Sequence, residues 1–593
     1  MSQYKAPLRD MRFCIDEVLD FPTHYKSFAQ GEEATPDLVE AILENAAQFA
    51  EEVLAPLDSI GDSEGCQWND GEVTTPTGFK EAYDTYISNE WIGLSMPQEV
   101  GGQGLPSSLA GLCMEIFCGA NHAWTMYPGL SMGGIQTIMA HASDELKALY
   151  LPKLIAGKWS ATMCLTEAHC GSDLGLLRTK ATPNDDGSYS ISGSKIFISS
   201  GEHDLTENII HIVLARLPDA PPGIKGISLF LVPKFNVDTN GECDERNKVK
   251  CGSIEHKMGI HGNATCVMNF DDAKGYLISP PHKGMSRMFT FINESRMGVA
   301  QQALAQMEAS HQSALAYAKD RVQFRGVNRS NPDADADPII VHPDVRRMLY
   351  TQKAFAEGGR ALSYYLAMQA DREHYLSDEQ SKAQAEQTLS LLTPIAKGFL
   401  SEVCMEATTY GIQVFGGHGY IKEWGQERHF RDARITSIYE GTTGIQGLDL
   451  LGRKILASKG KMLQDFIGTV MEFCQENPAS PYTQKLQEQM QQWAALTQQI
   501  GAKALRNPDE VNAAAYDYLM YSGYCVFAWI WAQSAAVARR ALDAGAQGND
   551  KEFYQQKLAT AEFFYTRLLP RTNGLAMSIQ AGTDTLPSFA LDS

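Results

Sequence analysis

Residues 431–446, with the sequence RDARITSIYEGTTGIQ, place one carboxylate, that of Glu440, between an aromatic ring and a glycine. A glutamate ordinarily titrates near pH about 4.3, and exclusion of water by Tyr439 and an apolar ligand is expected to raise its pKa. A carboxylate with a raised pKa can act as a general base near neutral pH. Gly441 has no Cβ and permits a sharp turn and the close approach of a ligand to the backbone. Glu440 is therefore a candidate general base.

The same residues also fit a purely structural interpretation. Thr442 or Thr443 can cap a helix. The apolar residues of that helix recur at helical spacing, at Ile445, Leu448, Leu451 and Ile455. Spacing alone does not separate a catalytic glutamate from an ordinary helix start.

Composition limits the class of protein to which this carboxylate belongs. The chain has 593 residues, several times the roughly 100–200 of one domain, so about three or four domains are expected. Hydrophobic residues make up 44% and charged residues 20%, which is ordinary globular usage. The 71 acidic and 50 basic residues give a formal charge of −21, which argues against binding to nucleic acid or to anionic lipid.

The ends and the cysteines give no sign of export or of metal binding. The start of the chain carries early charges at Lys5, Arg9, Asp10 and Arg12 and has no apolar run typical of a signal peptide. No window approaches the roughly 18 uncharged apolar residues of a membrane span. The twelve cysteines are scattered without a CxxC or other metal-ligand spacing. We therefore expect a reduced, metal-free cytoplasmic protein.

Residue patterns along the chain predict the elements that must position the carboxylate. Apolar residues recur at helical spacing from about 35 to 160, short β-branched and aromatic runs follow to about 280, and long helical segments continue to the end. The short runs predict a block of antiparallel sheet, and the first long helices predict a bundle. The expected division is an N-terminal extension (1–34), a helical domain (35–160), a β domain (161–280), a bundle domain with the base (281–458) and an extra helical domain (459–593).

Six motifs in order resemble those of the acyl-CoA dehydrogenases, over about residues 40–458. They are MCLTEAHCGSDLG (163–175), KIFISSG (195–201), KMGIHGNATCVMNFDD (257–272), DRVQFRG (320–326), QVFGGHGY (413–420) and YEGTTGIQ (439–446). The chain departs from the usual family motifs at Ala168 (usually Pro), Cys170 (Ala), Phe197 (Trp) and His261 (Arg). The resemblance implies a mainly α fold with a helical domain, a barrel-like β domain and a four-helix bundle.

The two ends of the chain resemble a larger bacterial branch of this family. The stretch YKAPLRDMRF and the block after residue 459 are similar to fatty acyl-CoA dehydrogenases and methylthiopropanoyl-CoA dehydrogenases of about this length. The extra block is expected to pack on the bundle or to extend a dimer interface.

The resemblance implies a specific role for Glu440. In the family, a base removes the pro-R proton next to a thioester carbonyl, while hydride leaves the neighbouring carbon for flavin N5. The backbone N–H of Glu440 would donate to the thioester carbonyl oxygen. A rival base position precedes the arginine of ESRMGVA, but it is occupied by Ser295, and Glu294 is turned roughly 100° away on an α-helix.

The resemblance also implies FAD as cofactor and assigns its contacts. Those expected from the β region are Met163, Leu165, Thr166, Ser172, Phe197, Ile198 and Ser199; those from the helical region are Arg321, Phe324, Gln413, Gly416, Gly417, Thr442 and Gln446. The substrate contacts are Ser172, Arg296, Tyr439 and Gly441. On composition alone, the 163–175 loop is an ordinary turn. Phe197 fits a core position by its spacing. A lone arginine on a helix, such as Arg296, is typically solvated or ion-paired on the helix surface.

The nucleotide part of that site has its own chemical logic. Arg321 offers a planar fork suited to pyrophosphate oxygens. The glycines near 416 do not form GxGxxG after a strand, so a Rossmann site is not indicated. In the family these residues reach the flavin of a neighbouring subunit, which implies a homodimer or a larger assembly.

Several functions remain open at this stage. Desaturation of a medium- or long-chain fatty acyl-CoA leads, with electrons passed to an electron-transfer flavoprotein, and 3-(methylthio)propanoyl-CoA is the next substrate. An acyl-CoA oxidase that uses dioxygen is a further alternative. A non-catalytic, nucleic-acid-associated relative is disfavoured because residues 459–593 contain no basic run.

Overall fold

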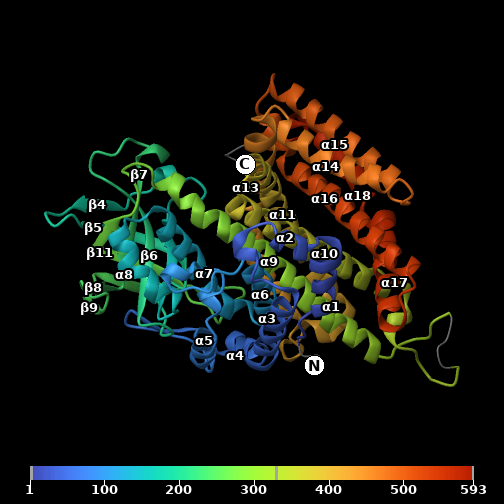
Figure 1. Ribbon diagram of the computed structural model, residues 1–593, viewed down its shortest axis with the longest axis horizontal. Helices are drawn as coiled ribbons and strands as arrows, with labels where there is room; N and C mark the ends of the chain where they lie inside the picture. The colour runs from blue at the N-terminus through green and yellow to red at the C-terminus, as the bar shows by residue number, and fades with distance from the viewer. Residues whose placement is uncertain (1–3, 328–331, 590–593) are drawn as a thin grey trace. The chain divides into compact units, whose positions relative to one another are not determined.

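The computed structural model describes residues 4–327 and 332–589, drawn as a ribbon in Figure 1. The chain divides into two compact units. The sheet unit is Asp37–Gly298, and the bundle unit combines Met1–Pro36 with Val299–Ser593. The boundary at residue 298 falls inside one long helix, α9 (Gly284–Asp320).

The sheet unit begins with helices, as the apolar periodicity predicts. They are α3 (Pro36–Phe49), α4 (Ala55–Glu64), α5 (Phe79–Ser88), α6 (Ser107–Ala120), α7 (His122–His141) and α8 (Asp144–Ile155). Asn121 begins α7 by accepting a hydrogen bond from the Trp124 N–H at 3.0 Å. Ser131, on the same helix, accepts from the Ala161 N–H at 3.1 Å and so joins α7 to the first strand of the main sheet.

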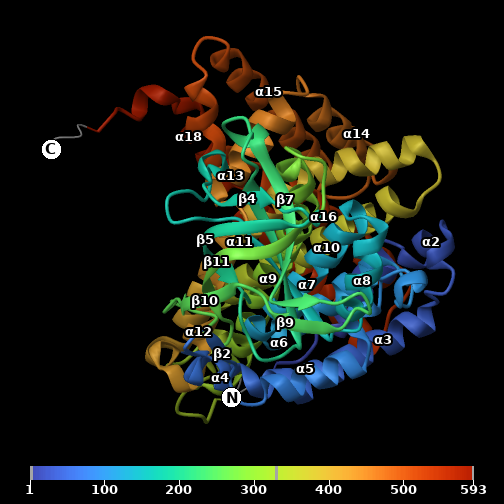
Figure 2. The same ribbon diagram turned by 90° about the vertical axis from the view of Figure 1, so that its left-hand side faces the viewer.

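Eleven strands are described in this unit. They are β1 (Gln67–Asn69), β2 (Glu72–Thr74), β3 (Trp159–Cys164), β4 (Lys180–Pro183), β5 (Tyr189–Ser199), β6 (Asn208–Arg216), β7 (Ile227–Pro233), β8 (Phe235–Val237), β9 (Cys243–Arg246), β10 (Val249–Ile254) and β11 (Thr265–Leu277). Seven of them form one sheet, in which β10, β11, β5 and β4 are neighbours and lie side by side in Figure 2. Because β7 pairs with both β11 and β6, the pairings β11–β5–β4–β6–β7 return to β11. This closed circuit confirms the barrel-like β domain.

The predicted antiparallel sheet is confirmed for five strand pairings, and two further pairings are parallel. β3 pairs with β6 in parallel over Trp159–Cys164, and Lys180 of β4 pairs in parallel with Arg216. Parallel neighbours need a long crossover, and the chain supplies one because residues 165–207 carry β4 and β5 before β6 returns beside β3. The buried run of β6 has no polar alternation, which is typical of a strand covered on both faces.

The regular elements described in the bundle unit are helices, with one isolated β-bridge between Val322 and Pro338. Its α-helices are α1 (Leu8–Arg12), α2 (Phe21–Tyr25), the later part of α9, α10 (Pro343–Tyr375), α11 (Glu379–Phe415), α12 (Gln426–Arg434), α13 (Thr443–Leu448), α14 (Lys461–Glu476), α15 (Thr483–Ala504), α16 (Asp509–Asp543), α17 (Gly548–Phe563) and α18 (Arg571–Ala581). A π-helical stretch, η12 (Asp449–Leu456), continues α13. None of the described helices combines the length and apolar character needed to cross a bilayer.

The extra C-terminal helices are orange and red in Figure 1. They pack on the bundle, which is one of the two arrangements expected from the sequence. Helix α16 contacts α10, α11 and α13. Helix α11 approaches α16 closely at Gly398. A Cβ there would lie only 2.5 Å from a Leu519 methyl group. Trp531 on α16 donates from its indole nitrogen to the Ala354 carbonyl of α10 at 3.2 Å.

A buried cluster of charges joins both ends of the chain to the bundle. Asp10 of α1 pairs with Lys557 of α17 and with Arg360 of α10. Arg360 also binds Glu308 of α9 at 2.8 Å, and Lys557 binds Glu357 of α10 at 2.8 Å. Burial alone would raise the pKa of Asp10, but Lys557 and Arg360 hold it below its ordinary value. Three carboxylates and two cations therefore face one another inside the protein, and Lys353 adds a third cation by pairing with Glu357.

Replacing Lys557 by Met should destabilise the bundle unit strongly. The substitution leaves Asp10 and Glu357 buried with a cation missing, a loss of about 3–5 kcal/mol in the free energy of unfolding. Lys461→Met is the matched control, because Lys461 forms an exposed pair with Asp465 at 2.7 Å. Urea unfolding of the full chain measures both variants. Equal stability of the two variants would contradict a structural role for the cluster.

Candidate active site

Glu440 lies in a short turn between two helical segments of the bundle unit. Helix α12 is followed by η11 (Ile435–Ser437), and α13 begins at Thr443. Thr442 caps α13, since its hydroxyl oxygen accepts from the Ile445 N–H at 3.4 Å. The cap interpretation is thus correct for Thr442, and it leaves Glu440 outside the helix, half-buried, two residues before its cap.

The backbone at Glu440 adopts a conformation that side chains rarely tolerate. Glu440 has φ +57° and Gly441 has φ +92°. A left-handed glutamate costs on the order of 1–3 kcal/mol unless its surroundings hold it, and such strain gathers at functional sites. The glycine that follows meets its own positive φ without that cost.

Two fully buried side chains donate hydrogen bonds to the carbonyl groups of this turn. Lys397 of α11 donates from Nζ to the Gly441 carbonyl at 2.6 Å. Gln446 of α13 donates from Nε2 to the carbonyls of Glu440, at 3.1 Å, and Gly441, at 3.3 Å. Gln446 was predicted as a cofactor contact; its described hydrogen bonds instead run to the turn that carries the glutamate.

The neighbours of the turn are fixed by side-chain hydrogen bonds. The Tyr439 hydroxyl donates to the amide oxygen of Gln302 on α9. Thr443 donates to a Glu402 carboxylate oxygen at 2.6 Å. Tyr439, Glu440 and Gly441 are all partly accessible, as are Gln302 and Glu402, whereas Thr443 is buried.

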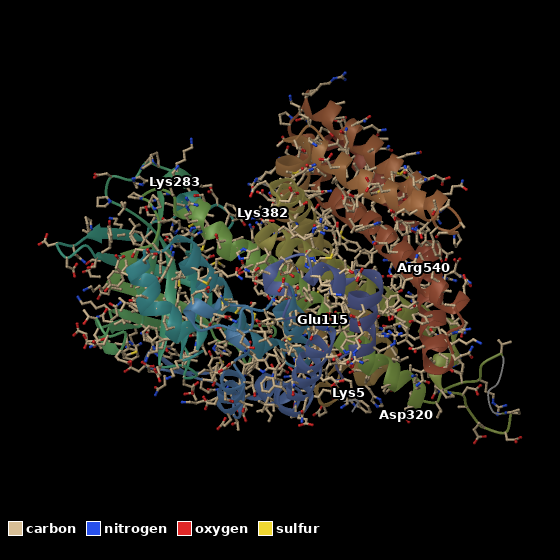
Figure 3. The ribbon with its side chains drawn as sticks, in the orientation of Figure 1. Lys5, Glu115, Lys283, Asp320, Lys382 and Arg540 are labelled. Atoms are coloured by element: carbon tan, nitrogen blue, oxygen red, sulfur yellow. The ribbon has the colours of Figure 1, made fainter. Side chains whose placement is uncertain are left out.

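The predicted nucleotide contacts of the bundle unit are all exposed. Arg321 and Phe324 follow Asp320, the last residue of α9, labelled in Figure 3. Phe324 is 76% exposed with φ +56°. Gln413 lies in the last turn of α11, and Gly416 and Gly417 open the 3-10 turn η9 (Gly416–Tyr420). The structure therefore presents a guanidinium, an aromatic ring and bare backbone to the outside of this unit.

The predicted flavin contacts of the sheet unit lie on two adjoining stretches. Met163 is on β3, with Leu165 and Thr166 just beyond it, while Ser172 is exposed in the following loop. The Ile196 N–H of β5 donates to the Thr166 carbonyl at 2.9 Å. Thr162 of β3 donates to the Ser199 carbonyl at 2.6 Å. The end of β3 and the end of β5 are thus held together.

Phe197 sits in a β-bulge that turns its ring outward. In the β5–β11 ladder, Lys195 pairs with Met268 and Ile198 with Cys266, so two residues of β5 oppose one of β11. Phe197 has φ +58° and is 59% exposed, while Ile198 is 2% exposed. Phe197 is thus not a core residue, and the core position that its spacing fitted is wrong.

A buried ion pair beneath this loop was missed by the sequence reasoning. Lys195 of β5 is fully buried and donates to the Leu165 carbonyl at 3.0 Å and to a Glu167 oxygen at 2.9 Å. Glu167 also accepts from the Arg178 N–H at 2.7 Å and the Thr179 hydroxyl at 2.6 Å. Burial alone would raise the pKa of Glu167, but Lys195 and these donors lower it to about 2. A lysine inside an otherwise β-forming run, SKIFIS, was the available signal.

The same loop brings three possible metal ligands together, which the sequence spacing did not suggest. Ligand atoms of Glu167, His169 and Cys170 lie within 4.8 Å of one another. Glu167 is already neutralised by Lys195, and burial raises the pKa of the Cys170 thiol. The arrangement is accounted for by the ion pair and does not by itself indicate a metal.

The rival base position on α9 carries no carboxylate, since it is Ser295. Glu294 beside it is half-buried, and burial raises its pKa against a hydrogen bond with Gln136 of α7. Arg296 is also half-buried. These residues belong to the part of α9 that lies in the sheet unit.

Comparison with known families accounts for most of the chain. Four family models match in order: acyl-CoA dehydrogenase N-terminal domain (residues 36–158), middle domain (162–273), C-terminal domain (282–456), and "Acetyl-CoA dehydrogenase C-terminal like" (466–589). The chain belongs to the acyl-CoA dehydrogenase family. It is therefore an FAD-dependent oxidoreductase that acts on CH–CH bonds.

Individual relatives cover nearly the whole chain. It is 42% identical to a 3-methylmercaptopropionyl-CoA dehydrogenase of Ruegeria pomeroyi, over 99% of this chain and 100% of the relative. It is 36% identical to a broad-specificity linear acyl-CoA dehydrogenase of Mycobacterium tuberculosis, over 96% of each. A crystal structure of an acyl-CoA dehydrogenase complexed with FAD, from Bacillus anthracis, has a TM-score of 0.70 at 21% identity, over 97% of this chain and 91% of that one.

The described residues fit the cofactor of this family. In the sheet unit, the exposed Phe197 ring suits contact with a flat ring system. In the bundle unit, Arg321 is exposed, and a Cβ at Gly416 or Gly417 would meet nothing within 4 Å. Such a cationic, uncovered stretch of backbone suits a pyrophosphate.

Replacing Lys195 by Met should loosen the loop that carries Thr166 and Ser172. Glu167 would remain buried without its cation, so the free energy of unfolding of the sheet unit should fall by about 3–5 kcal/mol and FAD should dissociate more readily. Lys250→Met is the control, because Lys250 pairs with Asp70 at 2.8 Å on the surface. Urea unfolding and the fluorescence of released flavin measure the two effects. Wild-type retention of FAD in Lys195→Met would contradict this prediction.

Proposed function

We propose that this protein desaturates linear acyl-CoA thioesters between the α and β carbons, with Glu440 as the general base. The observation that carries the proposal is the turn at Glu440 and Gly441, in which a partly accessible carboxylate is held at positive φ by Lys397 and Gln446. A helix start alone requires neither the strained glutamate nor the two buried supports.

In the proposed reaction, the Glu440 carboxylate removes the α-proton and holds it. The backbone N–H of Glu440 donates to the thioester carbonyl oxygen, where negative charge develops. Tyr439 and Gly441 border the reacting carbons, and Ser172 and Arg296 contact the remainder of the substrate. FAD, when bound, supplies the acceptor for the hydride that leaves the β-carbon.

The proposed FAD contacts are the residues that the family motifs assign to it. Met163, Leu165, Thr166, Ser172, Phe197, Ile198 and Ser199 would contact the flavin, and Arg321, Phe324, Gln413, Gly416, Gly417, Thr442 and Gln446 would contact the rest of the cofactor or support it. Exposure of Phe324 and Arg321 supports a homodimer in which these residues reach the cofactor of a second copy. An electron-transfer flavoprotein is the proposed electron acceptor, and the reduced cysteines favour the cytoplasm.

The substrate class rests on what the two curated relatives have in common. One relative is named for 3-methylmercaptopropionyl-CoA and the other for linear acyl-CoAs. The acyl chains in both names are unbranched. We therefore propose an unbranched acyl chain, with the methylthiopropanoyl thioester and medium-chain fatty acyl-CoAs as the first candidates. A methylene is worth only about 1–3 kcal/mol in an apolar pocket, so discrimination between them is expected to be modest.

Replacing Glu440 by Gln should abolish reduction of the flavin while leaving it bound. The amide keeps the shape of the side chain but cannot accept the α-proton, so the rate of flavin bleaching under nitrogen should fall by on the order of 10²–10⁴-fold or more. Glu472→Gln, an exposed change on α14, is the control. Bleaching at the wild-type rate in Glu440→Gln would remove the proposed base.

A panel of thioesters should separate the substrates and the acceptors. Unbranched C4 to C18 acyl-CoAs and methylthiopropanoyl-CoA are expected to bleach the flavin. Branched acyl-CoAs should react about tenfold more slowly, because an extra methyl group that a site for unbranched chains must accommodate costs about 1–3 kcal/mol. Reoxidation should be fast with an electron-transfer flavoprotein and slow in air. Rapid turnover in air would favour an oxidase, and no bleaching with any thioester would contradict the proposed function.

A further inference from the structure

Four aromatic side chains cluster where α9 ends and η9 begins in the bundle unit. Tyr317 stacks on Phe415 at a centroid distance of 4.2 Å, and His418 stacks on Trp424 at 4.3 Å. Tyr317 also meets Trp424 edge-on at 5.7 Å. The Tyr317 hydroxyl and His418 Nδ1 are 2.9 Å apart, so a hydrogen bond joins the two stacked pairs.

Between Phe415 and His418 of this cluster the chain runs through two exposed glycines, Gly416 and Gly417. A Cβ at Gly416 or Gly417 would meet nothing within 4 Å, and Gly416 has φ +60°. Glycine has the greatest backbone freedom of any residue, so this stretch depends on its flanking residues for its conformation. Phe415 and His418 are those flanking residues, and Tyr317 contacts both of them.

Tyr317 also bears directly on the position of Arg321. The two residues are one helical turn apart, and the Arg321 N–H donates to the Tyr317 carbonyl at 2.8 Å. The end of α9 that carries Arg321 is therefore tied to the residues on either side of Gly416 and Gly417 through the Tyr317 side chain. Neither Tyr317 nor His418 belongs to the residues expected to touch the cofactor.

We propose that Tyr317 and His418 are positioning residues that set the distance between Arg321 and the Gly416–Gly417 backbone and thereby determine the affinity for the FAD pyrophosphate. This inference rests on the proposed function, because it takes Arg321 and the two glycines as the diphosphate contacts. Their hydrogen bond acts through other groups, so its effect should fall on cofactor binding rather than on the proton transfer at Glu440.

The test separates the hydrogen bond from the ring stacking. Tyr317→Phe keeps the stack on Phe415 and removes the hydroxyl, and His418→Phe keeps a ring against Trp424 and removes Nδ1. Each change should raise the dissociation constant for FAD by about 3- to 10-fold, the value of one hydrogen bond. The FAD dissociation constant of the double variant should exceed that of the weaker-binding single variant by no more than about twofold, because both changes delete the same interaction.

Tyr350→Phe is the matched control, since it deletes a tyrosine hydroxyl that donates to Gln556 at 3.3 Å elsewhere in the unit. FAD affinity is measured on the full-length apoprotein by flavin fluorescence, and thermal unfolding of the apoprotein should be the same for the control and Tyr317→Phe. Control-like FAD affinity in Tyr317→Phe, or effects that multiply in the double variant, would overturn the inference alone. Failure of the wild type to bind FAD would instead remove the proposed function on which it rests.

Discussion

Buried lysine ammonium groups are the constraint on which both candidate-site loops depend. Lys195 and Lys397 are fully buried, and each donates to a backbone carbonyl of a loop, that of Leu165 in the sheet unit and that of Gly441 in the bundle unit. An ammonium taken out of water must have all its partners in place, so the loop cannot move away without leaving a buried charge unmatched. The loops are therefore fixed from inside the protein while their outer faces remain accessible.

The loop of Glu440 and the β5 strand beside the Leu165 loop each carry a residue with strained backbone. Glu440 and Phe197 both have positive φ, and both are at least partly exposed. A residue in this region persists only where its surroundings over-determine it, and here the support comes from buried hydrogen bonds and from a bulge in the β5–β11 ladder. Rigid support beneath an accessible, strained residue is the arrangement that a preorganised site requires.

Buried ion pairs also hold segments near the two ends of the chain in the bundle unit. Asp10 near the N-terminus and Lys557 near the C-terminus are paired inside the bundle unit, with Arg360 of α10 between other carboxylates. The close approach of α16 to α11 at Gly398 adds apolar contact along the same helices. The additional C-terminal helices are thus an integral part of the bundle unit.

The sequence by itself determined the helical and β regions, the barrel-like β domain through its family motifs and the cap at Thr442. These features follow from short-range patterns, because helical periodicity, strand alternation and capping depend on residues a few positions apart. The roles of Lys195, Lys397 and Gln446, the parallel pairing of β3 with β6 and the positive φ of Glu440 were decided only by the tertiary structure. Each of them depends on partners distant in sequence, and a local pattern carries no information on which buried groups will meet.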